Sequence, residues 1–156
     1  MAAPGRIERR LAELGLELPQ RPVPVGNYLP AARVGHLVFT SGQTARINGV
    51  RRYVGVVGRD VSESDAYLSA RDATLNCLAC AKQAIGSLDR VKRVVKVIGF
   101  VNVGREFGSH PTVINGASDL LERLFGEAGR HARSAVGLSS LPSNVSVEIE
   151  LVVEVA

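Results

Sequence analysis

Alternation of apolar and polar residues is clearest near the C-terminal end of the chain. From residue 145 to residue 153 every second side chain is apolar, and the residues between them are Ser146, Glu148, Glu150 and Val152. This period of two predicts a strand with one face in the core. The segment 132–140 is also rich in small and apolar residues, and Leu141-Pro142-Ser143-Asn144 is typical of a turn. The pattern predicts a hairpin-like unit of two strands.

Apolar side chains three to four residues apart predict three helices. The first is short and ends near Gly15, the second covers about residues 65–85 with Ser62 or Ser64 as its cap, and the third begins near Ser109 and ends at Gly126. Small side chains form the buried stripe of the second helix, so that it can approach a sheet closely: Ala66, Ala70, Ala73, Cys77, Cys80, Ala81 and Ala84.

Two further regions are rich in β-forming residues. Residues 34–47 and 50–57 flank Asn48-Gly49, a strong hairpin signal, and residues 91–103 are apolar on both faces, as in a central strand covered on both sides. The predicted order is helix, β, β, α, β, α, β, β. Two helices on one face of a mixed sheet indicate an α+β fold. Because the other face is left bare, we expect the chain to associate with itself.

Length and composition fit one soluble globular domain, residues 1–156, of which residues 1–20 form an N-terminal helical arm. No segment is apolar enough to span a membrane, and the first residues lack the features of a signal or transit peptide, so we expect a cytoplasmic protein. Lys and Arg number 19 against 15 acidic residues and are scattered, aromatic residues are 4%, and Trp is absent. This composition disfavours nucleic acid as a partner.

Several residues that suggest chemistry are better explained as structural. Cys77 and Cys80 form a C-x-x-C motif in the middle of a predicted helix, where they are expected to be small core residues. His36 is expected within a strand and His110 just before a helix, whereas His131 lies two residues before Arg133 and is a candidate to modulate its charge. Neither a nucleotide-binding glycine loop nor a nucleophile motif occurs.

Arg133 is the only charged residue between 132 and 143 and is therefore a candidate anion ligand. Glu148 lies fifteen positions later, on the other side of the predicted turn. Strand pairing can bring the two together, but the register is not fixed by the sequence. Alternatively, Arg133 forms an ion pair with Glu148 of another subunit, or Glu148 belongs to an ordinary polar face.

Several motifs together resemble the reactive intermediate deaminase family, also called RidA or YjgF. They follow the order of that family over about residues 22–155: Gly26-Asn27-Tyr28, Phe39-Thr40-Ser41-Gly42-Gln43, Ala132-Arg133-Ser134, Leu141-Pro142 and Val147-Glu148-Ile149-Glu150. The resemblance implies a chorismate-mutase-like fold, a homotrimer whose sheets form a central barrel, and ligand sites in the clefts between subunits.

The resemblance also implies hydrolysis of reactive enamines and imines, such as 2-aminoacrylate, to 2-keto acids and ammonia. In this interpretation Arg133 anchors the substrate carboxylate and Glu148 orients and deprotonates the attacking water. Tyr28 from a neighbouring subunit closes the pocket, and Asn115 lies near the same cleft. Backbone amides near Gly42 and Ala135 complete the grip on the carboxylate, and no metal or cofactor is needed.

The chain departs from the usual family pattern at the walls of the expected cleft. Ala135 stands where the family often has Cys, and Gly137 where a polar residue is common. Two other functions are therefore kept as alternatives. One is a non-catalytic binder of small keto acids or amino acids, or a chaperone-like protein, and the other is an endoribonuclease, against which the lack of a His pair and of stacking aromatics counts.

Overall fold

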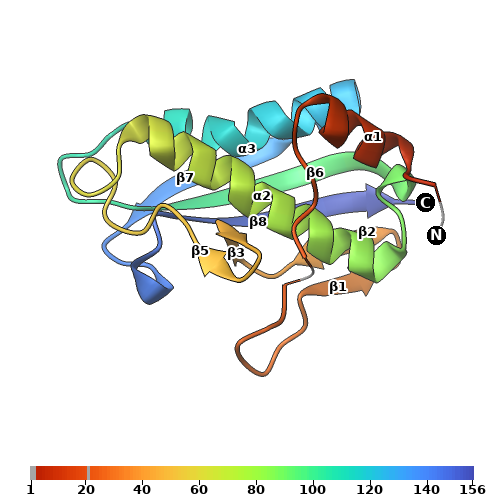
Figure 1. Cartoon of the computed structure of the whole chain (residues 1–156), viewed down its shortest axis with the longest axis horizontal. Helices are drawn as coiled ribbons and strands as arrows, with labels where there is room; N and C mark the ends of the chain where they lie inside the picture. The colour runs from red at the N-terminus through yellow and green to blue at the C-terminus, as the bar shows by residue number, and fades with distance from the viewer. Residues whose placement is uncertain (1–2, 21) are drawn as a thin grey trace.

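The computed structural model describes residues 3–20 and 22–156. Figure 1 shows the helices gathered over one face of a mixed sheet, so the predicted α+β class is confirmed. The strands of the main sheet lie in the order β1-β2-β8-β6-β7, with β3 also paired to β8, and β4 and β5 form a separate hairpin. The α-helices are α1 Arg6–Glu13, α2 Glu63–Ile85 and α3 His110–Phe125. Short 3-10 turns cover Leu88–Arg90, Gly126–Gly129 and Pro142–Asn144. The strands are β1 Ala31–Val34, β2 Leu37–Thr40, β3 Gln43–Thr44, β4 Arg46–Ile47, β5 Val50–Arg51, β6 Val91–Asn102, β7 Ala132–Leu138 and β8 Val147–Val155.

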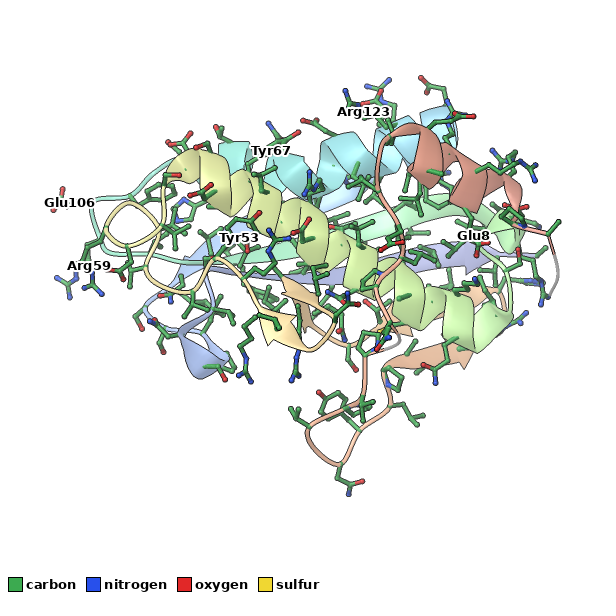
Figure 2. All side chains as sticks on the ribbon, in the orientation of Figure 1. Glu8, Tyr53, Arg59, Tyr67, Glu106 and Arg123 are labelled. Atoms are coloured by element: carbon green, nitrogen blue, oxygen red, sulfur yellow. The ribbon has the colours of Figure 1, made fainter. Side chains whose placement is uncertain are left out.

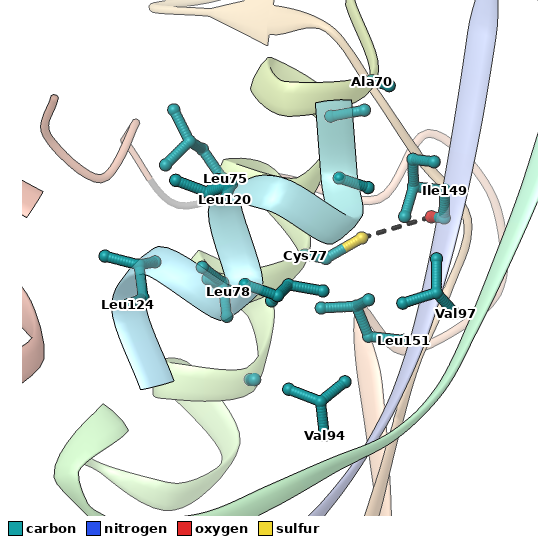
Figure 3. Packing of buried hydrophobic residues seen from close by; sticks show 14 of the residues in the cluster. Ala70, Leu75, Cys77, Leu78, Val94, Val97, Leu120, Leu124, Ile149 and Leu151 are labelled. Atoms are coloured by element: carbon teal, nitrogen blue, oxygen red, sulfur yellow. Dashed lines mark hydrogen bonds between the residues drawn. The ribbon is translucent and has the colours of Figure 1, made fainter. Parts of the chain in front are cut away.

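Helix α2 is placed by its cap and by its small side chains. Ser62 accepts a hydrogen bond from the Asp65 N–H and so satisfies one of the free donors of the first turn. Residues of the predicted stripe are fully buried, and Cys77 Sγ donates to the Ile149 carbonyl of β8 at 3.2 Å (Figure 3). Small side chains therefore bring the helix axis close to the sheet, as predicted. Ala84, at the last turn, is exposed.

The N-terminal arm is docked on the domain. The Asp89 carboxylate accepts the N–H groups of Arg6 and Ile7 at 2.7 and 2.9 Å, which satisfies two free donors at the start of α1. Ile7 and Leu11 are almost fully buried in the common core. The helix therefore packs on its own domain, within the arm that the sequence predicted.

Strand β6 is the central strand between β7 and β8. It runs antiparallel to β8 and parallel to β7. The chain passes from β6 to β7 through α3. The predicted hairpin of β7 and β8 is therefore wrong, because β6 separates the two strands. Residues 139–146 connect them across the end of β6.

The connection is fixed by Asn102 at the end of β6. The Asn102 amide donates to Asn144 Oδ1 at 3.0 Å and to the Val145 carbonyl at 3.1 Å. Ser143 and Asn144 take left-handed backbone conformations that tighten the turn beneath this amide. Leu141-Pro142-Ser143-Asn144 is thus a turn, as predicted, but it crosses over a strand instead of closing a hairpin.

The first β region is more divided than its composition predicts. The turn at Asn48-Gly49 is confirmed, but its two arms, β4 and β5, are only two residues long. The expected strand over 34–47 is broken into β2, β3 and β4, and β1 adds a hairpin partner to β2. His36 lies in the turn between β1 and β2, next to Gly35 with φ of 57°, and not inside a strand.

The face of the sheet opposite the helices is open in a single chain. Glu148, Glu150 and Val152 point to it from β8, where they are half-buried. The expectation that β6 is covered on both faces is not met within one chain, since Ile98 and Phe100 are only half-buried there. Large apolar side chains on β2 and β7 are 36–43% exposed: Leu37, Phe39, Val136 and Leu138.

The contact between α2 and α3 depends on Gly116. A Cβ at this position would overlap the backbone carbonyl of Tyr67 and lie 3.2 Å from Ala70 Cβ, so the two helices would have to separate. Tyr67 of α2, labelled in Figure 2, also links the helices: its hydroxyl donates to Asp119 of α3 at 2.7 Å. Close packing of this pair therefore tolerates no side chain at 116.

We predict that Gly116→Ala lowers the free energy of unfolding by about 2–3 kcal/mol, because overpacking forces backbone movement. Urea unfolding monitored by circular dichroism measures the change. Gly104→Ala is the matched control, since a Cβ there meets nothing within 4 Å, and it should leave the midpoint nearly unchanged. Equal effects of the two variants would contradict the close approach of α2 and α3.

Candidate functional site

Arg133 lies on the face of β7 that the helices cover. It pairs in register with Val97 of β6, a fully buried core residue on that face. Its Nη1 donates to Asn115 Oδ1 at 2.8 Å and to Ser118 Oγ at 3.1 Å, and its Nη2 donates to the Pro111 carbonyl at 3.4 Å. The guanidinium is therefore held against α3. The structure thus brings Arg133 and Asn115 together.

The edge of β7 stays accessible around this arginine. Ala135 and Gly137 follow Arg133 on the same face, and their small size leaves the strand thinly covered. A Cβ at Gly137 would overlap the His110 imidazole, so His110 takes the space of the side chain missing at 137. Within the described chain β7 bonds only to β6, which leaves N–H and carbonyl groups along its outer edge for another partner.

Glu148 lies on the opposite, open face, where β8 pairs with β3. Its register partners are Thr44 of β3 and Phe100 of β6. A Cβ at Gly42 would come within 2.8 Å of Glu148 Cδ, so the missing side chain of Gly42 makes room for the carboxyl group. Burial, followed by repulsion from Glu150, raises the pKa of Glu148 above its ordinary value. The protonated form of this carboxyl group is therefore favoured more than that of an ordinary glutamate.

A cavity of about 420 Å³ opens beside Glu148. Tyr28, which is 47% exposed, and Gly42 line it together with Glu148. Asn76 of α2 contributes to the wall and donates to the carbonyls of Thr44 and Arg46 at 3.0 and 2.8 Å, so it fixes the loop beneath the cavity. Sequence analysis missed Asn76, because a polar residue inside a helix carries no signal of such a role.

The predicted site residues thus fall into two groups within one chain. Tyr28, Gly42 and Glu148 share the cavity on the open face, whereas Arg133, Asn115 and Ala135 lie on the helix-covered side of β7. Strand β6 and the thickness of the sheet separate the groups, and the described residues show no ion pair between Arg133 and Glu148. Tyr28 lines the cavity beside the Glu148 of its own chain, and the expectation that it closes the pocket of a neighbouring subunit stays a prediction.

A second, shallower depression of about 220 Å³ lies beside Arg133. His131 Nδ1 is 2.7 Å from the Gly129 carbonyl, and its Nε2 is 2.9 Å from Ser118 Oγ, which also contacts the guanidinium. Burial lowers the pKa of His131, and the charge of Arg133 adds to the effect. Sequence analysis noted His131 but missed Ser118, although its spacing of three from Asn115 places both on one face of α3.

The cysteines are buried structural residues, as expected. Burial raises the pKa of Cys80 to about 11 and that of Cys77 further still, so neither thiol ionises near neutral pH. In the part of the chain that the structure describes, no three His, Cys, Asp or Glu side chains are grouped so that they could hold a metal ion. Over the same residues, no helix combines the length and apolarity of a membrane span.

Comparison with known proteins identifies the family. Residues 8–155 match the family described as "YjgF/chorismate_mutase-like, putative endoribonuclease". Protein TCP17 of Trypanosoma cruzi is 38% identical over 155 residues, which are 99% of this chain and 97% of that protein. The 2-iminobutanoate/2-iminopropanoate deaminase of Dermatophagoides farinae is 33% identical over 138 residues, 88% of this chain and 93% of that protein.

Solved structures agree with this result. The crystal structure of Atu1372 from Agrobacterium tumefaciens, a protein described with unknown function, has a TM-score of 0.91 and 45% identity, and covers 97% of this chain and 93% of that one. A sheet with its helices on one face, matched over nearly the whole chain, is thus shared with that protein. The chain belongs to the YjgF/RidA family and has its chorismate-mutase-like fold.

Proposed function

We propose that this protein hydrolyses reactive enamine and imine intermediates, such as 2-aminoacrylate, to 2-keto acids and ammonia. The observation that carries the proposal is the chemistry of the two half-sites. One half-site holds the Arg133 guanidinium in place and leaves some of its N–H donors unbonded. The other holds Glu148, a carboxyl group of raised pKa, beside a cavity. The name of the D. farinae relative, 2-iminobutanoate/2-iminopropanoate deaminase, supports the same class of substrate.

We further propose that each complete site forms where two chains of a homotrimer meet. The half-sites lie on opposite sides of the sheet, so one chain cannot bring Arg133 to its own Glu148. A second copy that packs its open sheet face against this one would bury the exposed apolar residues of β2 and β7. In the proposed trimer the accessible edge strand β7, which carries the Arg133 group, lies beside the open face of the neighbour, so that Arg133 approaches the Glu148 and Tyr28 group of that chain.

The chemistry needs only these residues and water. An enamine first takes a proton at carbon and becomes the iminium. Arg133 holds the carboxylate of the iminium, and the Glu148 carboxylate accepts a proton as water attacks the imine carbon. The tetrahedral carbinolamine then receives that proton on nitrogen. As the C–N bond breaks, the Glu148 carboxylate accepts the hydroxyl proton so that the C=O of the keto acid forms, ammonia leaves, and the proton returns from Glu148 to solvent. Positioning contributes most of the rate, because the iminium is already electrophilic.

Arg133→Ala should lower kcat/KM for 2-aminoacrylate by about 30- to 1,000-fold, because the substrate carboxylate loses a hydrogen-bonded ion pair. The reaction is followed by keto-acid release from 2-aminoacrylate generated in situ. Arg133→Lys should recover only part of the loss, since Lys lacks the fork of parallel donors. An undiminished rate in Arg133→Ala would remove this residue from the site. Binding of a keto acid by wild type without turnover would favour the non-catalytic alternative, and cleavage of added RNA would favour the endoribonuclease.

The pH profile should reveal the raised pKa of Glu148. The carboxylate is the form that accepts the proton, so activity rises as pH increases through the pKa of this group. The acid limb of the kcat/KM profile should therefore lie above pH 4.5, the ordinary pKa of a glutamate. Glu148→Gln should lower kcat by about 100-fold or more at neutral pH and abolish this limb. The matched control is Glu106→Gln, on an exposed loop (Figure 2) outside the residues that line the cavity, and it should keep both rate and profile. An acid limb that persists in Glu148→Gln would assign it to another group.

Mixed oligomers test whether two chains complete one site. Co-expression of Arg133→Ala and Glu148→Gln chains should restore activity, because an interface between an intact Arg133 and an intact Glu148 forms in about one quarter of random pairings. Purification through two different tags isolates the mixed species. Each variant alone should be inactive. If the mixed species is as inactive as the parents, both residues come from the same chain or neither acts.

A further inference from the structure

The hydrogen bonds around Arg133 form a chain that begins at a backbone carbonyl. The Gly129 carbonyl can only accept, so the proton of neutral His131 lies on Nδ1, and Nε2 is left as an acceptor. The Ser118 hydroxyl therefore donates to Nε2, at 2.9 Å, and its oxygen lone pairs face Arg133 Nη1 at 3.1 Å. One tautomer of His131 thus fixes the orientation of the Ser118 hydroxyl.

Neutral His131 is the form that this arrangement needs. Charged groups face the imidazole from two sides, Glu122 on α3 and Arg133 on β7, and Arg130 lines the same depression. Burial and the charge of Arg133 lower the pKa of His131. The hydrogen bond to the Gly129 carbonyl and the charge of Glu122 oppose this shift. A neutral ring avoids placing two cations on either side of one hydroxyl oxygen.

The chain of bonds decides which donors of Arg133 are left for a ligand. Both hydrogens of Nη1 are engaged, by Asn115 Oδ1 and Ser118 Oγ, and one hydrogen of Nη2 is directed to the Pro111 carbonyl. Of the five N–H donors of a guanidinium, the Nε–H and one Nη2–H have no acceptor among the residues that the structure describes. Two donors on one rigid planar group match the two oxygens of a carboxylate.

We propose that Ser118 and His131 are positioning residues for Arg133, which orient its guanidinium so that the two spare N–H donors grip the carboxylate of the substrate. This rests on the proposed function, in which Arg133 binds that carboxylate. Neither residue touches the substrate. His131 acts through Ser118, and Ser118 acts through Arg133, so the two lie in series.

Binding of pyruvate and of pyruvamide to the full-length protein tests the proposal. Ser118→Ala and His131→Phe should each weaken pyruvate binding by about 3- to 10-fold and leave pyruvamide binding nearly unchanged. Only a carboxylate has two oxygens that can accept both free N–H donors of Arg133. In turnover assays with 2-aminoacrylate the same variants should raise KM and change kcat by less than about 2-fold. A purely structural defect would weaken both ligands alike.

Conservative replacements and a double variant sharpen the test. Ser118→Thr keeps the hydroxyl, and His131→Gln keeps an acceptor for it, so both should bind pyruvate nearly as wild type does. The double variant Ser118→Ala/His131→Phe should bind pyruvate no more weakly than the worse single variant. Each single change already removes the same interaction with Arg133, so the second change removes nothing further. The matched control is His36→Ala, at the exposed turn between β1 and β2 on the other edge of the sheet.

The outcomes separate this inference from the proposed function. If Arg133→Ala weakens pyruvate binding but Ser118→Ala and His131→Phe do not, the positioning role is wrong and the carboxylate anchor stands. If Arg133→Ala itself leaves pyruvate binding unchanged, the anchor fails and the positioning role fails with it. Additive losses in the double variant, or equal losses for pyruvate and pyruvamide, also contradict positioning in series.

Discussion

The central place of β6 in the sheet is the constraint on which the rest of the structure depends. Because β6 pairs parallel with β7 and antiparallel with β8, it holds Arg133 and Glu148 on different strands, and the alternation of side chains turns them to opposite faces. Asn102 at the end of β6 fixes the turn that carries the chain from β7 across to β8. The proposed function, which uses both groups in one site, therefore depends on a second chain.

The two half-sites differ in how the chain prepares them. Arg133 is oriented by acceptors from α3, which fix the directions of its N–H donors. The raised pKa of Glu148 instead comes from its surroundings, because burial and the charge of Glu150 favour the protonated carboxyl group. The absence of side chains at Gly42 and Gly137 gives room to Glu148 and to His110. Under the proposed function, the group that binds the carboxylate and the group that transfers the proton are thus set up separately within one chain.

Much of the fold follows from local patterns. The three helices, the cap at Ser62 and the small stripe of α2 were predicted because spacing and capping are local properties. The pairing of β7 with β8 was predicted wrongly, because an apolar strand, a turn and another strand look alike whether or not a third strand lies between them. The division of residues 31–51 into short strands depends on turns at Gly35 and on the amide of Asn76, which no periodicity reveals.

The candidate site was predictable through resemblance more than through residue chemistry. Arg133, Glu148, Tyr28 and Asn115 were found by their motifs, and their roles stay predictions. The motifs did not indicate that Tyr28 lines the cavity beside the Glu148 of its own chain, because no local pattern shows which strand the segment 22–30 approaches. For Ser118 the sequence offered only its spacing from Asn115, because the contact of Ser118 with His131 exists only after α3 packs beside β7.

A crystal structure with pyruvate bound tests the central claim most directly. The account predicts a trimer in which the pyruvate carboxylate contacts Arg133 of one chain while its carbonyl carbon lies within reach of a water held by Glu148 of the next chain. Pyruvate bound at Arg133 with every Glu148 turned away from it, or bound wholly within one chain, would contradict the account.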